Sequence, residues 1–161
     1  PDILGFKYKM SNIQAAIGLA QLKRAKDILS RKRDIANQYQ TILKGTSCLF
    51  LGEDKDQINS YWMCSLLFAD ENQRNQVRSN LNLHGVETRP LFPPVHLMPI
   101  YEGIPGNHPV AENLSVRGLN LPSWPDLPKE KIEYICHLIK EVLLCKKIPL
   151  SAELEDLLAK F

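Results

Sequence analysis

Helix and strand patterns alternate along most of this 161-residue chain. The clearest pattern follows Pro128, where Ile132, Ile135, Ile139 and Val142 recur at the spacing of a helix stripe that faces a core. The predicted order is helix, strand, helix, strand, helix, strand and helix, with a proline or glycine near most boundaries. This order predicts an α+β domain in which a small antiparallel sheet has its helices on one side.

The N-terminal third predicts one long helix that begins at Ser11 and ends at Gly45. Ser11 forms a capping box with Gln14, and Gly45 is a typical C-terminal stop. Within residues 13–22, apolar and small residues occupy most sides of the helix, so this half needs a partner that covers it. The next stretch, 23–33, carries six Lys or Arg and one Asp, which is typical of a solvated face.

The remaining predicted elements are shorter and are bounded by caps and breakers. Asp70 and Gln73 form a second capping box at the start of a helix that ends at Gly85. Pro90 either confines the strand around it to the edge of the sheet or ends that strand early. The other expected elements are strands at 59–68, 86–92 and 118–121, a helix between Pro109 and Gly118, and a terminal helix after Ser151.

Composition restricts the class of protein. With 44% hydrophobic and 24% charged residues, the chain is typical of a globular domain. No apolar run approaches the roughly 18 residues of a membrane span. The first residues lack both a signal-peptide pattern and an initiator Met, so we expect a cytoplasmic protein whose start is cut. Cys48, Cys64, Cys136 and Cys145 lack zinc-site spacing, so we expect reduced thiols and no metal site.

Candidate ligand-binding residues lie in one proline-rich loop. The common catalytic motifs for hydrolysis, phosphate binding and dinucleotide binding are not found in the sequence. Arg89, His96 and Tyr101 fall within 13 residues of one another, and Arg is suited to bidentate phosphate recognition. These residues either contact a ligand or belong to ordinary loop packing, and the residues alone leave both readings open.

Several segments, taken in order, carry a resemblance to a known family. They are Gly5–Leu22, Gly85–Phe92, Pro94–Tyr101 and Gly118–Ser123. They resemble the DegT/DnrJ/EryC1/StrS sugar-nucleotide aminotransferases, which use pyridoxal phosphate (PLP), and the later segments are similar to perosamine-synthetase-type members. The resemblance implies the small domain of a fold-type-I aminotransferase that acts on a nucleotide-linked 4-keto-6-deoxy sugar in O-antigen (lipopolysaccharide) biosynthesis.

The resemblance also implies where the cofactor and the substrate bind. The lysine that holds PLP belongs to an N-terminal domain absent from this sequence, so no residue here is expected to be catalytic and the chain alone is expected to bind no PLP. Lys7 and Lys9 stand where the family has the Asn and Arg of its GfNyR motif, the Asn typically reaching the cofactor phosphate of the neighbouring subunit. Arg89, His96 and Tyr101 correspond to positions near the sugar-nucleotide pocket.

Three parts and a set of partners follow from the same resemblance. Residues 1–46 would form an interdomain and dimerisation segment, 47–145 the small α/β domain, and 146–161 a tail helix. The expected partners are the missing PLP domain, a second copy of the chain, the nucleotide sugar and an amino-acid donor, with no nucleic acid and no membrane. Two alternatives stay open: a free-standing, non-catalytic remnant that acts as an oligomerising or regulatory module, and a nucleic-acid binder that uses the basic stretch.

Overall fold

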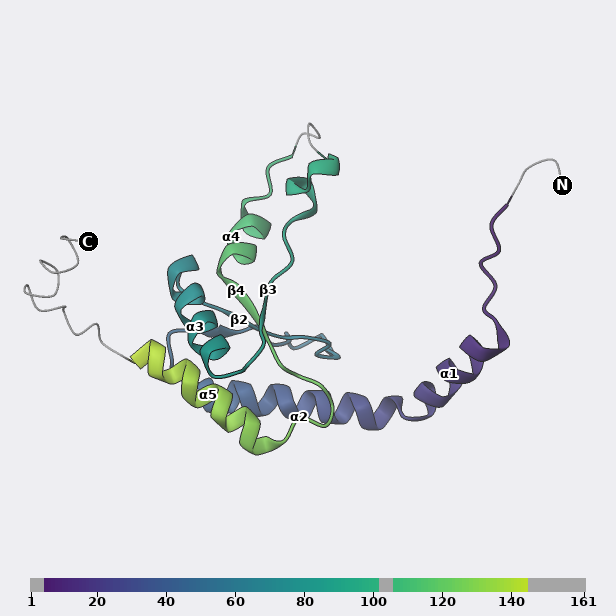
Figure 1. Ribbon diagram of the computed structural model, residues 1–161, viewed down its shortest axis with the longest axis horizontal. Helices are drawn as coiled ribbons and strands as arrows, with labels where there is room; N and C mark the ends of the chain where they lie inside the picture. The colour runs from purple at the N-terminus through teal and green to yellow at the C-terminus, as the bar shows by residue number, and fades with distance from the viewer. Residues whose placement is uncertain (1–4, 102–105, 145–161) are drawn as a thin grey trace, which may run out of the picture.

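A four-stranded antiparallel sheet organises the computed structural model, which describes residues 5–101 and 106–144 (Figure 1). The strands lie in the order β1 (Leu49–Phe50), β2 (Cys64–Leu67), β4 (Gly118–Leu121) and β3 (Arg89–Pro90). The helices are α1 (Asn12–Lys23), α2 (Ala25–Leu43), α3 (Glu71–Leu83), η1 (Val95–Leu97), η2 (Pro99–Tyr101), α4 (Pro109–Arg117) and α5 (Lys129–Leu144). The predicted α+β class and antiparallel sheet are confirmed.

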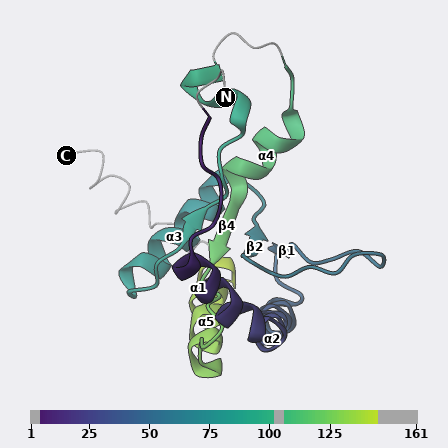
Figure 2. The same ribbon diagram turned by 90° about the vertical axis from the view of Figure 1, so that its right-hand side faces the viewer.

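One face of the sheet carries the core. The register pairs Cys64 with Leu121 and Leu66 with Leu119, and all four side chains are buried among apolar residues of α2, α3 and α5. Helix α5 contacts both α2 and α3 (Figures 1 and 2). Its predicted stripe is confirmed, with three isoleucines buried and one valine partly buried: Ile132, Ile135, Ile139 and Val142.

The N-terminal third forms two helices, so the prediction of one long helix is wrong. The capping box at Ser11 is confirmed, but α1 ends at Lys23 and α2 begins at Ala25. At Arg24 the backbone N–H donates to the carbonyl of Gln21 (3.0 Å), a bond to the third preceding residue that tightens and ends the helix. No residue of α1 is buried, and Figure 1 shows it extending away from the sheet.

The basic stretch is only partly a solvated face, because two of its cations are buried or partly buried. Lys32 is buried, and its ammonium donates to the carbonyls of Trp62 (2.9 Å) and Ser123 and to the Ser123 hydroxyl (2.8 Å). Arg33 forms a two-pronged ion pair with Glu53 and also donates to a backbone carbonyl. The expectation of a uniformly solvated face is therefore corrected at these two residues.

Other predicted elements are shorter than expected. The strand predicted at 59–68 reduces to β2, and the one predicted at 86–92 reduces to β3 at the sheet edge. Only half of the second capping box forms, because the Gln73 side chain accepts from Ala69 instead of Asp70. The helix predicted after Ser151 lies outside the described residues, within which no helix is long and apolar enough to cross a membrane.

Glu53 makes the stability of the 52–62 loop sensitive to acid. The Arg33 guanidinium and the backbone N–H of Asn59 lower the pKa of Glu53 to about 2. A carboxyl whose pKa is lowered by folding stabilises the fold above its unfolded pKa of about 4.5, and this contribution disappears as the pH falls through about 2. We therefore expect Glu53→Gln to lower the urea midpoint at pH 6, and the difference from the original chain to shrink toward zero near pH 2.

Asp54→Asn supplies the matched control for this titration, since its carboxyl lies exposed on the same loop. Its urea midpoint should follow that of the original chain at both pH values. A Glu53→Gln midpoint that differs from the original chain by the same amount at pH 6 and pH 2 would contradict the assignment.

Candidate functional site

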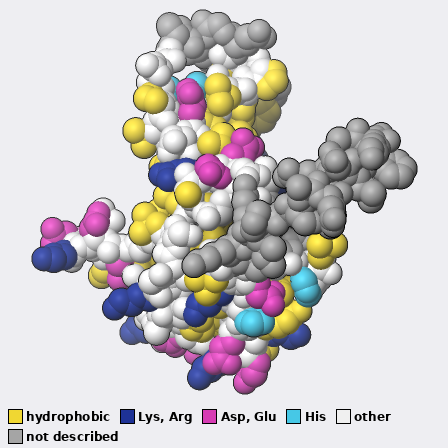
Figure 3. All heavy atoms as spheres, turned by 90° about the vertical axis from the view of Figure 1, so that its left-hand side faces the viewer, with side chains coloured by type: hydrophobic (Ala, Val, Ile, Leu, Met, Phe, Trp, Pro, Cys, Tyr) yellow, Lys and Arg dark blue, Asp and Glu magenta, His cyan; other side chains and the backbone are white. Residues whose placement is uncertain are grey.

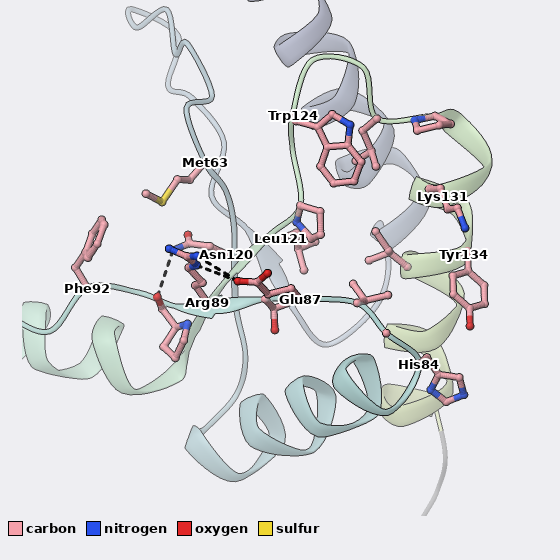
Figure 4. A pocket seen from close by; sticks show the side chains of 18 residues that line it. Met63, His84, Glu87, Arg89, Phe92, Asn120, Leu121, Trp124, Lys131 and Tyr134 are labelled. Carbon is pink, nitrogen blue, oxygen red and sulfur yellow. Dashed lines mark hydrogen bonds and ion pairs between the residues drawn. The ribbon is translucent and has the colours of Figure 1, made fainter.

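An open groove of about 790 Å³ runs along the edge strand β3 toward the first half of α5 (Figure 4). Its walls come from the turn after α3, from β3, and from the segment between β4 and α5. Gly85, with φ of 74°, ends α3, and the N–H of Val86 donates back to the carbonyl of Leu81 (2.9 Å). This turn directs the chain from the helix into β3 and so places Arg89 on the groove wall.

A buried amide holds the edge strand in place. Asn120 alternates with the core residues of β4, so its side chain lies on the opposite face of the sheet. Its Oδ1 accepts from the Ser65 hydroxyl (2.6 Å) and its Nδ2 donates to the carbonyl of Pro90 (3.3 Å). Arg89 pairs only with Glu87 (3.2 Å) among the described residues, and more than four fifths of its side chain is exposed. The guanidinium is therefore available to a ligand, since such an exposed pair contributes little.

The groove contains Arg89 but not the other predicted site residues. His96 lies on η1, where its Nε2 is 2.8 Å from Glu112 Oε1 and its ring packs 4.7 Å from that of His108. Tyr101 ends η2. Neither residue lines the groove; both belong to the part of the chain that projects at the top of Figure 1. Their ligand-binding roles stay predictions.

Lys7 and Lys9 lie on the exposed segment that precedes α1. This segment extends away from the sheet at the right of Figure 1, so the structure does not bring these two lysines to Arg89. Their role toward a cofactor also stays a prediction.

The described lysines do not fit the covalent anchor of PLP. A lysine that attacks a carbonyl must offer a free, desolvated amine. Lys32 is the only buried lysine of the described residues, and its three donors already meet three acceptors. Lys131 lies exposed where α5 borders the groove. The expectation that no residue of this chain is catalytic stays a prediction.

The described part of the chain also lacks a reactive thiol and a cluster of metal ligands. Cys48, Cys64 and Cys136 are free thiols, and burial raises the pKa of each, to about 12 for Cys136. A thiol in this state is a poor nucleophile. No group of three or more His, Cys, Asp or Glu side chains is placed to hold a metal ion within these ranges.

Many of the exposed large apolar side chains lie in two regions. The first is the segment before α1 together with α1 itself, where the exposed side chains are Phe6, Tyr8, Met10, Ile13, Ile17, Leu19 and Leu22. The second is the projecting part that carries η1, η2 and α4, where Figure 3 shows hydrophobic side chains gathered on one face. It includes Val95, Leu97, Ile100 and Val110. Exposed apolar surface on this scale is typical of a protein that has binding partners.

Asn120 and Lys32 were not among the predicted site residues. The strand pattern placed Asn120 in 118–121, but nothing in the sequence showed that its side chain would bind Ser65 and the edge strand. The only sequence feature around Lys32 is the run of basic residues, which is typical of a solvent-exposed helix face.

Comparison with known proteins gives the family. The model of the DegT/DnrJ/EryC1/StrS aminotransferase family matches residues 1–140. The chain is 46% identical over 140 residues to GDP-perosamine synthase of Escherichia coli O157:H7 and 36% identical over 148 residues to GDP-perosamine synthase of Vibrio cholerae. These matches cover 87% and 89% of this chain but only 38% and 40% of the relatives.

Solved structures give the same fold. The aminotransferase TlmJ from Streptoalloteichus hindustanus superposes with a TM-score of 0.81 at 25% identity, over 89% of this chain and 39% of its own. Spr1654 from Streptococcus pneumoniae, solved in its PLP form, superposes with a TM-score of 0.78 at 24% identity, over 89% of this chain and 38% of its own, and supports the fold alone. On the family match, the chain belongs to the DegT/DnrJ/EryC1/StrS aminotransferase family.

Proposed function

We propose that this chain is the C-terminal portion of a PLP-dependent aminotransferase that acts on a nucleotide-linked 4-keto-6-deoxy sugar. The observation that carries the proposal is the 46% identity to a GDP-perosamine synthase, over an alignment that spans only 38% of that relative. The absence of a suitable lysine among the described residues is consistent with a cofactor anchored elsewhere. The reaction would serve O-antigen synthesis in the cytoplasm.

In this proposal the exposed apolar residues of the N-terminal segment and α1 contact the rest of the enzyme and a second subunit. Residues 1–46 then act as the interdomain and dimerisation segment, and 47–145 as the small domain. Bound PLP supplies the electron sink for amino transfer from an amino-acid donor. From this chain, Lys7 and Lys9 lie near the cofactor phosphate, while Arg89, His96 and Tyr101 bind the nucleotide sugar.

A chimaera tests the proposal directly. This chain replaces the matching C-terminal portion of the Escherichia coli GDP-perosamine synthase, and mass spectrometry follows amination of a GDP-4-keto-6-deoxyhexose with glutamate as donor. We expect turnover within about tenfold of the parent enzyme, a barrier difference of about 1.4 kcal/mol. The parent enzyme without its C-terminal portion is the control and should be inactive.

A chimaera that is folded, dimeric and loaded with PLP, yet does not aminate the sugar, would contradict the proposal. It would favour a non-catalytic remnant that retains only the oligomerising surface. Amino transfer by this chain alone would contradict the proposed position of the catalytic lysine.

A further inference from the structure

An exposed tryptophan stands on a constrained stretch of backbone just before β2. Nearly three quarters of Trp62 is accessible to solvent. The preceding residue, Tyr61, has φ of 48°, the only positive value at a non-glycine among the described residues. Its N–H donates to Asn59 Oδ1 (2.8 Å), and the buried Lys32 donates to the carbonyl of Trp62 (2.9 Å). Strained backbone that is held in this way is common at functional sites.

The Trp62 ring is paired with a second exposed ring. Phe92, which follows β3, lies with its centroid 6.4 Å from that of Trp62 and its plane inclined by 25°. About two thirds of Phe92 is exposed. These two rings, the aromatic pair, come from segments 30 residues apart and are stacked, and most of each ring stays open to solvent.

The aromatic pair borders the groove that contains Arg89. Phe92 and Met63 are both part of the groove lining, and Figure 4 shows them at the same end, near Arg89. A flat aromatic surface favours planar, unsaturated ligands, while a guanidinium favours phosphate. The aromatic pair therefore suits the base of a nucleoside diphosphate, and the Arg89 guanidinium suits its phosphates.

We propose that the Trp62–Phe92 pair stacks on the base of the nucleotide sugar while Arg89 binds its diphosphate. The inference rests on the proposed function, because that function supplies the nucleotide class, and it adds residues that the family resemblance did not indicate. Aromatic stacking on a base changes affinity by about tenfold or more, so loss of one ring should weaken binding by that factor.

Fluorescence of the chain itself tests this assignment. The sequence has two tryptophans, so in a Trp124→Phe background Trp62 is the only indole. We expect GDP to quench this emission in a saturable manner and inorganic pyrophosphate to leave it unchanged. Adding Phe92→Ala should raise the GDP midpoint about tenfold. Ile58→Ala, an exposed apolar change in the same loop, should leave the midpoint unchanged.

The outcomes separate this inference from the proposed function. Saturable GDP quenching in a chain whose chimaera is inactive would support the stacking site and contradict the proposed aminotransferase. No GDP quenching, or equal quenching by pyrophosphate, would overturn the stacking site whether or not the chimaera is active.

In an active chimaera, Trp62→Ala should raise the KM for the GDP sugar about tenfold, and Trp62→Phe should largely restore it. A Trp62→Ala chimaera with unchanged KM and a lower yield of folded dimer would also overturn the inference, because the indole would then be packing against another part of the enzyme.

Discussion

Replacing Lys32 with methionine should lower the free energy of unfolding by about 3 kcal/mol. Methionine keeps the apolar stem of the side chain but removes all three hydrogen-bond donors. The carbonyls of Trp62 and Ser123 and the Ser123 hydroxyl then lose their buried partner. Urea unfolding of the chain measures the change as a lower midpoint with an unchanged slope.

Lys26→Met is the matched control, because Lys26 lies exposed on the same helix, α2. Its free energy of unfolding should stay within about 0.5 kcal/mol of the original chain. Ser123→Ala offers a second check, since its cost should fall when Lys32 is already methionine. A Lys32→Met chain as stable as the Lys26→Met chain would show that this buried ammonium contributes no net stability.

Lys32 also connects the core to the groove. Trp62 and Ser123, whose carbonyls it binds, directly precede the groove residues Met63 and Trp124. One side chain on α2 therefore fixes two segments that are about 60 residues apart in sequence. We infer that Lys32 is a positioning residue for the groove, with no contact to a ligand of its own.

The sequence predicted those elements whose signals are local. The cap at Ser11, the glycine stop after α3, the proline start of α4 and the isoleucine stripe of α5 all depend on neighbours within about two helical turns, and each is confirmed. Pro90 left an edge position or an early end open for its strand, and β3 is a two-residue strand at the edge of the sheet. Local propensity and periodicity therefore sufficed for these elements.

Features that depend on distant partners could not be predicted. The break at Arg24 has no proline or glycine, and it separates a helix that packs on the core from one that contacts little of the described chain. Strand β1 has only two residues, too few for a period-2 pattern. Of the predicted site residues only Arg89 lines the groove. Its neighbour Asn120 holds the edge strand through hydrogen bonds to Ser65 and to Pro90, which lie on two other strands.

Leu81→Ala should lower the free energy of unfolding by about 2–5 kcal/mol. The Leu81 side chain is fully buried in the cluster that α3 shares with α5 and the sheet. The substitution keeps the Leu81 carbonyl, which accepts from the N–H of Val86. The lost stability therefore comes from the missing apolar contacts and the cavity that remains. Because α3 leads directly into the groove wall, this packing also holds the turn that positions β3.

Leu83→Ala makes the same chemical change two residues later on the same helix, where the side chain is 82% exposed. Both variants replace leucine by alanine in the last turn of α3, so the difference between them reports mainly on burial. The Leu83→Ala chain should unfold within about 0.5 kcal/mol of the original. Equal losses at the two positions would mean that α3 does not present Leu81 to the core, and the groove wall described above would then lack its support.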